Sequence, residues 1–360
     1  MDAKLRSLFR EDFDDLEPYV PVKPLDVLAA EIGVPIGQLV KLDANENLYG
    51  PIPAIREAVA EADLHIYPDP GQTALREAIA AYAGVRPEQV VAGQGADDLI
   101  DIILRLTQPR AVIDCPPTFG MYRFLGKING AAIEEVPRLA GFEVDVAGVR
   151  QRVSESGATV VFLTSPNNPT GNLLRPDQLE ALLTLDALIV VDEAYVEFSG
   201  SSLVRYLDGS PNLVILRTFS KWAALAGLRV GYALCHPELA EPMMAIKQPY
   251  NVSVTADVAA RTAIAQRGVI FETVNSLIAE RERMAGLVGA LGWLRPYPSA
   301  ANFVLFDVLG RAAKDAATDL RRRGVLVRHY SRPDLSNMIR ISAGRPEDTD
   351  RLLAALKELT

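Results

Sequence analysis

The chain has 360 residues, of which 49% are hydrophobic and 23% charged, a composition typical of globular proteins rather than disordered ones. Its net charge of -9 argues against partners that need a basic surface, so we expect neither a nucleic acid nor a membrane. Two cysteines are too few for a disulfide framework, and no Cys/His cluster has metal-ligand spacing, which predicts that no metal is bound.

The N-terminal residues 1–17 are acidic and lack the apolar core of a signal peptide. No apolar run approaches the ~18 residues that would cross a bilayer. A cytoplasmic location is therefore expected. At this length, one large and one smaller domain are expected as well.

In chain order, the first 40 residues contain four prolines among short apolar pieces, which predicts an N-terminal arm with one helix over 24–32. Residues 41–51 and 64–71 are dense in turn formers and predict loops. Helices are predicted over 53–62 and 73–83.

From residue 85 onward, short apolar runs alternate with helical patterns such as those over 96–106, 119–129 and 176–185. Runs this short and this apolar are typical of strands that are buried on both faces. The sequence thus predicts an α/β fold whose large domain has a mostly parallel seven-stranded sheet covered by helices. The predicted strands are 89–92, 111–114, 131–134, 159–163, 187–191, 213–216 and 230–234.

After Ala233 the pattern changes to a long helical region over 237–244 and 256–291, followed by mixed strands and helices. This predicts a smaller α+β domain at the C-terminus. Strands are expected over 302–306, 325–328 and 338–342, and helices over 312–323 and 347–359. The expected division is 1–45 for the arm and part of the small domain, 46–245 for the large domain and 246–360 for the small domain.

Ligands of parallel sheets bind beyond the carboxyl ends of the strands, so the residues that follow each strand carry the functional information. Gly93 and Gly95 lead into a predicted helix, but Asp98 occupies the place of the third glycine of a dinucleotide-binding motif. This disfavours a nicotinamide dehydrogenase. A glycine turn before a helix still offers free backbone N–H groups for one phosphate.

Three further strand ends carry polar groups in a restrained backbone. Prolines and a glycine surround the two amides of the 165–171 segment, Ser-Pro-Asn-Asn-Pro-Thr-Gly. Asp192 ends a strand that should be deeply buried, where a carboxylate needs a cation such as a protonated pyridine nitrogen. A salt bridge within the fold is the alternative for this residue.

The third strand end brings two hydroxyls, a lysine and an arginine to one turn: Thr218, Ser220, Lys221 and Arg229. Hydroxyls and a guanidinium suit a phosphate, and a partly desolvated lysine can form a Schiff base. The alternative is a surface turn with an ordinary solvated lysine.

With these motifs in series, the chain resembles the fold-type I aminotransferases of class II, which use pyridoxal phosphate, and among them the histidinol-phosphate aminotransferase family. The resemblance covers nearly the whole chain. The motifs are highly specific for the superfamily and less specific for the substrate. The matching segments are 45–51, 67–68, 95–97, 116–122, 165–171, 192–195, 220–221, 227–229 and 340–342.

This resemblance implies that Lys221 holds the cofactor aldehyde and then moves a proton as acid and base, while Asp192 keeps the ring nitrogen protonated. Tyr195 and Asn168 are expected at the ring oxygen and Phe119 on the ring face. The expected phosphate ligands are Gly95, Ala96, Asp97, Thr218, Ser220 and Arg229, with Tyr67 reaching across from a second subunit, so that a homodimer with shared active sites is implied.

The same resemblance implies that Arg340 binds a substrate carboxylate, that Asn45 lies where the site closes, and that Tyr19 and Arg328 meet a substrate phosphate. The implied reaction is transamination between L-histidinol phosphate and 2-oxoglutarate in histidine biosynthesis. Trp222 follows the lysine where smaller residues are common, which predicts a narrower pocket. An aromatic amino acid aminotransferase, a phosphothreonine decarboxylase and, remotely, a non-catalytic effector-sensing domain stay open as alternatives.

Overall fold

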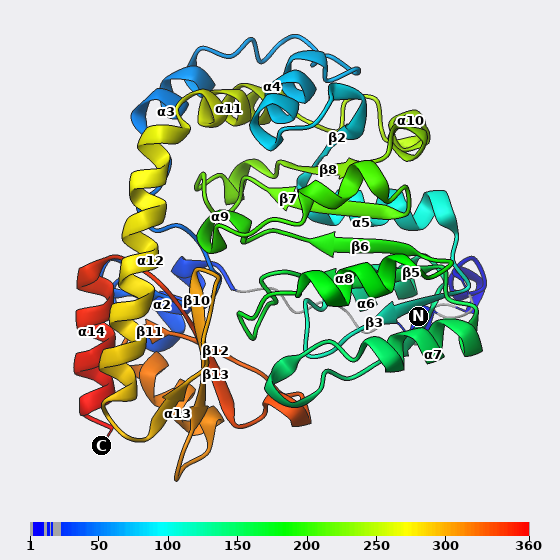
Figure 1. The fold of residues 1–360 in the computed structure, drawn as a ribbon. Coiled ribbons are helices and arrows are strands. Elements are labelled where there is room, and N and C mark those ends of the chain that lie inside the picture. Colours follow the sequence, from blue (N-terminus) through cyan, green and yellow to red (C-terminus); the bar gives the residue numbers. More distant parts are fainter. Residues whose placement is uncertain (1–2, 11–12, 15, 17–22, 360) are drawn as a thin grey trace.

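The computed structural model of the protein describes residues 3–10, 13, 14, 16 and 23–359. Its centre is a seven-stranded sheet in the order β2-β8-β7-β6-β5-β3-β4 (Figure 1). Only β8 runs antiparallel to its neighbours, β2 and β7, so the predicted α/β class and mostly parallel sheet are confirmed. The strands are β2 (Val90–Gly93), β3 (Ala111–Asp114), β4 (Ala132–Glu135), β5 (Val160–Thr164), β6 (Leu188–Asp192), β7 (Leu213–Thr218) and β8 (Gly231–Cys235).

Helices cover both faces of this sheet because successive side chains of a strand point to opposite faces. In β5, Val160 and Phe162 face a core with α5, α6 and α10, while Val161 and Leu163 face a core with α4, α8 and α11. Burial on both sides explains why the strands are continuous apolar runs. The covering helices are α5 (Gly95–Thr107), α6 (Met121–Ile128), α10 (Pro237–Ile246), α4 (Thr73–Ala83), α7 (Val146–Ser156), α8 (Pro176–Leu183) and α11 (Val254–Ala265).

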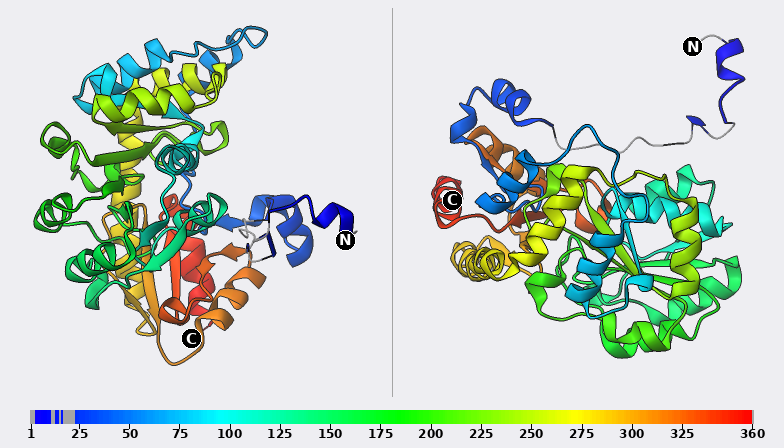
Figure 2. Two further views of the ribbon diagram at one scale, coloured as in Figure 1. Left: turned by 90° about the vertical axis from the view of Figure 1, so that its right-hand side faces the viewer. Right: turned by 90° about the horizontal axis from the view of Figure 1, so that it is seen from above.

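A second, smaller body is built on an antiparallel sheet with the order β12-β13-β10-β9. Figure 2 shows these C-terminal elements, in orange and red, gathered at one end of the molecule. A two-stranded parallel pair of β1 (Val40–Lys41) and β11 (Val325–Leu326) ties the N-terminal region to this body. Its elements are β9 (Leu294–Pro296), β10 (Phe303–Val308), β12 (Arg328–His329), β13 (Met338–Ser342), α13 (Ala313–Arg322) and α14 (Pro346–Lys357).

The helical region predicted over 256–291 consists of two helices that meet at Gln266, α11 and α12 (Arg267–Gly289). The first packs on α3 and α4 beside the large sheet, whereas α12 contacts α14 in the small body. Figure 1 shows α12, in yellow, running the length of the molecule. The predicted helix of the N-terminal region is α2 (Leu25–Ile32), and the other helices are α1 (Ala3–Arg6), α3 (Pro53–Ala60) and α9 (Val196–Ser199).

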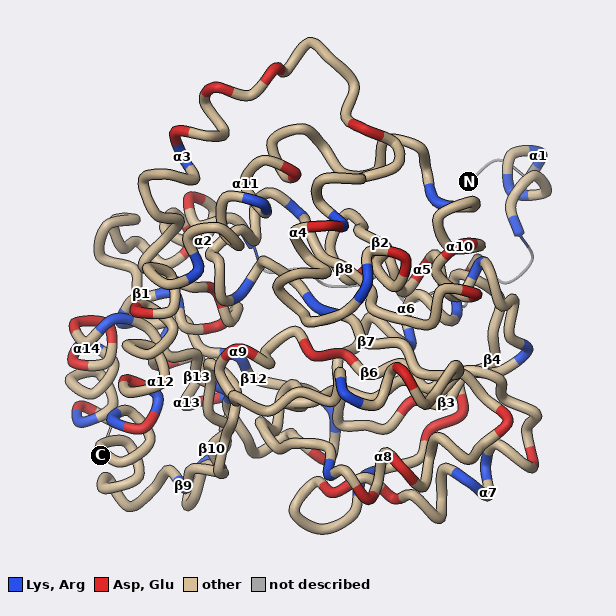
Figure 3. Tube along the Cα trace, turned by 45° about the horizontal axis from the view of Figure 1, so that its top comes forward, with Lys and Arg blue, Asp and Glu red and all other residues tan. Residues whose placement is uncertain are grey.

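Acidic and basic residues are interspersed along the chain (Figure 3). Within the described part of the chain, none of the helices has the length and apolar character needed to cross a membrane. Cys115 and Cys235 are both buried free thiols.

Candidate active site

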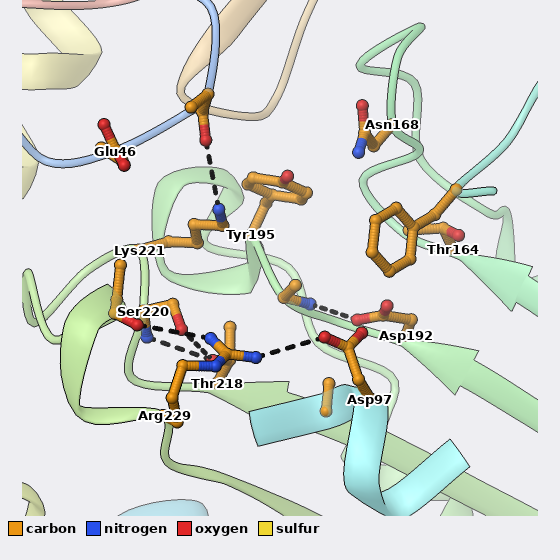
Figure 4. Close-up of a pocket in the computed structure, with 15 residues that line it drawn as sticks. Glu46, Asp97, Thr164, Asn168, Asp192, Tyr195, Thr218, Ser220, Lys221 and Arg229 are labelled. Carbon is orange, nitrogen blue, oxygen red and sulfur yellow. Dashed lines mark hydrogen bonds and ion pairs between the residues drawn. The ribbon is translucent and has the colours of Figure 1, made fainter. Parts of the chain in front are cut away.

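A pocket lies where the strands of the large sheet end, between that sheet and the 44–46 segment (Figure 4). The cavity has a volume of about 160 Å³ and opens to solvent. Its walls are polar on several sides. They are formed by Ala44, Glu46, Ala96, Asp97, Phe119, Thr164, Asn168, Asp192, Ala194, Tyr195, Thr218, Ser220, Lys221, Ala226 and Arg229.

Three adjacent strands deliver side chains to this pocket at their carboxyl ends: Thr164 from β5, Asp192 from β6 and Thr218 from β7. Strand β6 occupies the middle of the seven, so Asp192 ends the central strand as the sequence predicts. Asp192 as a whole residue is 4% exposed. Burial raises its pKa to about 6, although hydrogen bonds from the Tyr122 hydroxyl (2.8 Å) and the Ala194 N–H (2.9 Å) favour the charged form.

A donor cluster forms the end of the pocket near helix α5. The Thr218 hydroxyl donates to Ser220 Oγ at 2.9 Å, and Arg229 lies 3.2 Å from the Asp97 carboxylate. A Cβ on Gly95 would lie 2.6 Å from Arg229 Nη2, so only glycine lets the guanidinium pack against this helix start. Backbone N–H groups, hydroxyls and a guanidinium thus converge as they would around a phosphate.

Lys221 projects toward the 44–46 segment, and its Nζ donates to the Ala44 carbonyl at 3.4 Å (Figure 4). Burial, helped by the positive charge of Arg340, lowers the pKa of this amine to about 8. A lowered pKa leaves a larger share of the amine neutral near physiological pH. A neutral amine can attack an aldehyde and can also accept a proton.

A second layer connects the small body to the pocket. The Asn45 amide donates to the Tyr195 hydroxyl at 3.0 Å and accepts from the Ser342 hydroxyl at 2.8 Å. Arg340 donates to Asn168 Oδ1 at 2.6 Å and to the Asp43 carbonyl at 2.6 Å. Its Nε is buried and has no hydrogen-bond partner among the described residues, so the guanidinium keeps a donor for a ligand.

Two residues around the pocket have left-handed backbone conformations, Asn45 with φ 55° and Arg229 with φ 52°. Such conformations cost energy in residues other than glycine and are enriched at functional sites. Both side chains take part in the polar contacts described above, which explains why the strain is tolerated there.

The comparisons with known proteins agree with this geometry. The model of the family described as aminotransferase class I and II matches residues 37–356. The chain belongs to this family. A histidinol-phosphate aminotransferase of Roseiflexus castenholzii is 46% identical over 100% of both chains, and a chloroplastic one of Arabidopsis thaliana is 43% identical over 98% of this chain and 86% of that one.

Among solved structures, the histidinol-phosphate aminotransferase of Sinorhizobium meliloti in complex with pyridoxal-5'-phosphate resembles this aminotransferase with a TM-score of 0.87 and 27% identity. The match covers 98% of this chain and 100% of that one. Pyridoxal phosphate also fits the donor set found here. The donor cluster near α5 suits its phosphate, the buried Asp192 its ring nitrogen, and the Lys221 amine its aldehyde.

The aminotransferase brings most of the predicted site residues together in the pocket. Asn45 and Arg340 do not line the pocket themselves but donate hydrogen bonds to Tyr195 and Asn168, which do. Gly95 packs against the Arg229 guanidinium. Arg328 lies in a neighbouring cavity instead, and Tyr67 is on the surface. Tyr19 falls outside the described residues.

One expectation about the pocket is wrong. Trp222 does not line it, because its ring is fully buried in the core and stacks on Tyr82 with the ring centroids 5.5 Å apart. Lys221 lines the pocket, whereas the side chain that follows it packs in the core. The width of the pocket is therefore set by other residues.

Sequence reasoning did not single out Glu46, Thr164 or Tyr122 as site residues. Glu46 and Thr164 line the pocket, and Tyr122 contacts Asp192 from behind it. Thr164 could have been found because it directly follows a predicted strand. Tyr122 is in the first turn of α6, three residues after Phe119, which precedes the helix, and the proximity of the two aromatic residues was the available signal.

Proposed function

We propose that this protein transfers the amino group of L-histidinol phosphate to 2-oxoglutarate, forming imidazole acetol phosphate and L-glutamate in histidine biosynthesis. The observation that carries this proposal is a pair of arginines beside the pocket, Arg340 behind its wall at Asn168 and Arg328 in the neighbouring cavity. Arg328 of β12 and Arg340 of β13 are directly opposite each other in the antiparallel sheet, so they lie on the same face. Histidinol phosphate offers a phosphate and 2-oxoglutarate offers carboxylates, and a guanidinium binds either group with two hydrogen bonds.

Bound pyridoxal phosphate supplies an aldehyde and an electron-accepting ring. We assign Lys221 as the amine that holds the aldehyde and later carries a proton, since it is the lysine in the pocket with a lowered pKa. Asp192 is assigned to the ring nitrogen, which its carboxylate keeps protonated. Tyr195 and Asn168 are assigned to the ring oxygen, and Phe119 to the ring face.

For the substrates, Arg340 is assigned to the carboxylate, because it is 6% exposed and keeps a free Nε donor. Arg328 lines a cavity of about 290 Å³ that Lys314 and His329 also line, a basic environment that suits a phosphate. Asn45 links the small body to Tyr195 and is assigned to closure of the site. Tyr19 stays a predicted phosphate contact.

We infer that the active unit is a homodimer to which Tyr67 contributes from the second subunit. Tyr67 is 78% exposed and stacks on Tyr250 with ring centroids 4.6 Å apart. Leu64 and Ile66 beside it are 73% and 56% exposed. A surface cluster of four large apolar side chains is typical of a protein interface. The cytoplasmic location stays a prediction.

The test of this proposal is the steady-state kcat/KM of the cofactor-loaded protein with 2-oxoglutarate as acceptor and histidinol phosphate, phenylalanine or tyrosine as donor. A preference of about tenfold or more for histidinol phosphate, worth about 1.4 kcal/mol in the transition state, is expected. The Arg328→Gln variant should lose most of this preference by raising KM for the phosphorylated donor only.

A preference for phenylalanine and tyrosine would favour the alternative of an aromatic amino acid aminotransferase. Carbon dioxide release from phosphothreonine would favour the decarboxylase. A protein that binds pyridoxal phosphate but turns over none of these donors would favour the effector-sensing alternative.

A further inference from the structure

Tyr122 is a buried aromatic residue of α6 whose orientation is fixed on two sides. It is 0% exposed. Its ring stacks on Phe162 with centroids 5.0 Å apart and planes 2° apart, and meets the edge of Phe119 at 5.6 Å and 84°. These contacts leave the ring little freedom, so the direction of its hydroxyl is set by packing.

That hydroxyl lies 2.8 Å from Asp192 Oδ2 and 2.8 Å from Thr164 Oγ1. An ionised carboxylate can only accept hydrogen bonds, so Tyr122 donates its single proton to Asp192 and accepts one from Thr164. The other carboxylate oxygen, Oδ1, accepts from the Ala194 N–H. Each oxygen of Asp192 is therefore held by one donor from the protein.

We propose that Tyr122 is a positioning residue whose hydroxyl keeps the Asp192 carboxylate ionised and pointed into the pocket for the ring nitrogen of pyridoxal phosphate. This inference rests on the proposed role of Asp192. Tyr122 does not line the pocket, and its hydroxyl acts through the carboxylate.

The charged surroundings explain why such support is needed. Burial and the negative charge of Asp97 from α5 both raise the pKa of Asp192, while Tyr122, the Ala194 N–H and the Lys221 ammonium lower it. Asp114, at the end of β3, adds a further carboxyl that faces Tyr122. Because the hydrogen bond from Tyr122 favours the charged form, its removal must raise the pKa of Asp192, and the carboxylate is then lost at a higher pH.

The experiment compares Tyr122→Phe with Tyr82→Phe, which removes another largely buried tyrosine hydroxyl, one that bonds to Glu197 at 3.2 Å and lies outside the pocket wall. Two quantities are measured for each: the dissociation constant of pyridoxal phosphate from the apoprotein, and the pH dependence of the bound cofactor's visible absorbance. In Tyr122→Phe the cofactor should bind about tenfold more weakly, and the acid-side midpoint should rise by about one pH unit. Tyr82→Phe should match the parent protein in both.

A Tyr122→Phe protein with unchanged affinity and midpoint would overturn the inference, as would weaker binding with an unmoved midpoint, since a purely structural hydroxyl gives that result. Asp192→Asn separates the two proposals. If it weakens cofactor binding while Tyr122→Phe does not, only the role of Tyr122 fails, whereas unchanged binding in both variants means that the assignment of Asp192 fails too. Should Tyr122→Phe not fold, Thr164→Val removes the donor behind the hydroxyl and should move the midpoint in the same direction.

Discussion

At the scale of single residues, the reactivity of the pocket depends on an amine with a lowered pKa. Burial is the larger cause of the shift in Lys221, and the positive charge of Arg340 is the next. The same arginine is the proposed carboxylate ligand. A substrate carboxylate that neutralises Arg340 would therefore also raise the affinity of the Lys221 amine for a proton.

The rate at which the apoprotein takes up pyridoxal phosphate covalently should rise with pH around a midpoint of about 8, because only the neutral amine of Lys221 attacks the aldehyde. In Arg340→Gln the midpoint should move to higher pH, since a charge that lowers the pKa is gone. Stopped-flow absorbance measures this rate. The matched control is Arg328→Gln on the opposite strand, and an equal shift in that variant would contradict a specific effect of Arg340.

Sequence reasoning found the site residues whose position follows from strand ends, such as Asp192, Thr218 and Lys221. It did not assign Tyr122, because an aromatic residue on an apolar helix face looks like a core residue until its hydroxyl partner is known. The expectation that Trp222 narrows the pocket was wrong for a related reason. The direction of a side chain after a strand depends on the turn, which the sequence pattern does not define.

At the scale of elements, the start of α5 lies unusually close to β8. An added Cβ on Gly231 of β8 would lie 2.8 Å from the Arg217 carbonyl oxygen and 2.9 Å from the Ala96 nitrogen, and neither backbone atom can move easily. This close approach places the N-terminus of α5 at the proposed phosphate position.

A buried ion pair connects the ends of β6 and β7. Arg217 of β7 donates two hydrogen bonds, of 2.9 and 3.0 Å, to the carboxylate of Glu193, which follows β6.

Gly231→Ala should weaken pyridoxal phosphate binding about tenfold, because relieving the overlap moves α5 away from the sheet and costs on the order of 1–3 kcal/mol. Gly227→Ala is the matched control, since nothing lies within 4 Å of its added Cβ. Equilibrium titration of the apoproteins gives both affinities. Equal affinities in the two variants would show that this packing does not position the phosphate ligands.

All seven strands of the large sheet could be predicted, six of them because burial on both faces leaves a continuous apolar run, whereas β4 is a partly exposed edge strand with two glutamates. Two other features of the fold could not be predicted from the sequence. The break between α11 and α12 has no proline: α11 packs on α3 and α4, whereas α12 leads from the large-sheet core, which holds Ile270 and Val274, to α14 of the small body. The short strand β9 is recognisable only through its pairing with β10, since it contains an arginine and a proline.

At the scale of the whole molecule, we propose the division into 1–45, 46–245 and 246–360. The pairing of β1 with β11 supports assigning the N-terminal region to the small domain. Beyond the second boundary, α11 still packs on α3 and α4 of the large domain, so the two domains share an extensive contact. Asn45 and Arg340 then connect the two domains at the pocket, through Tyr195 and Asn168.

If the surface around Tyr67 is the dimer interface, Tyr67→Glu should convert the protein to a monomer, because it introduces a charge into a patch that must lose water. Sedimentation velocity of the holoenzyme measures this, and cofactor affinity should fall as well. Leu139→Glu alters another exposed apolar side chain, 53% exposed, and should leave the dimer intact. A dimer that survives Tyr67→Glu would place the interface elsewhere.

The most direct test of the active site is to reduce the holoenzyme with borohydride, which fixes the cofactor to the amine that holds it, and to map the modified lysine by mass spectrometry. Modification of Lys221 alone is expected, because its buried amine lies among the proposed ring and phosphate ligands. Modification of a different lysine, or a mixture of surface lysines without Lys221, would contradict the proposed site and the mechanism built on it.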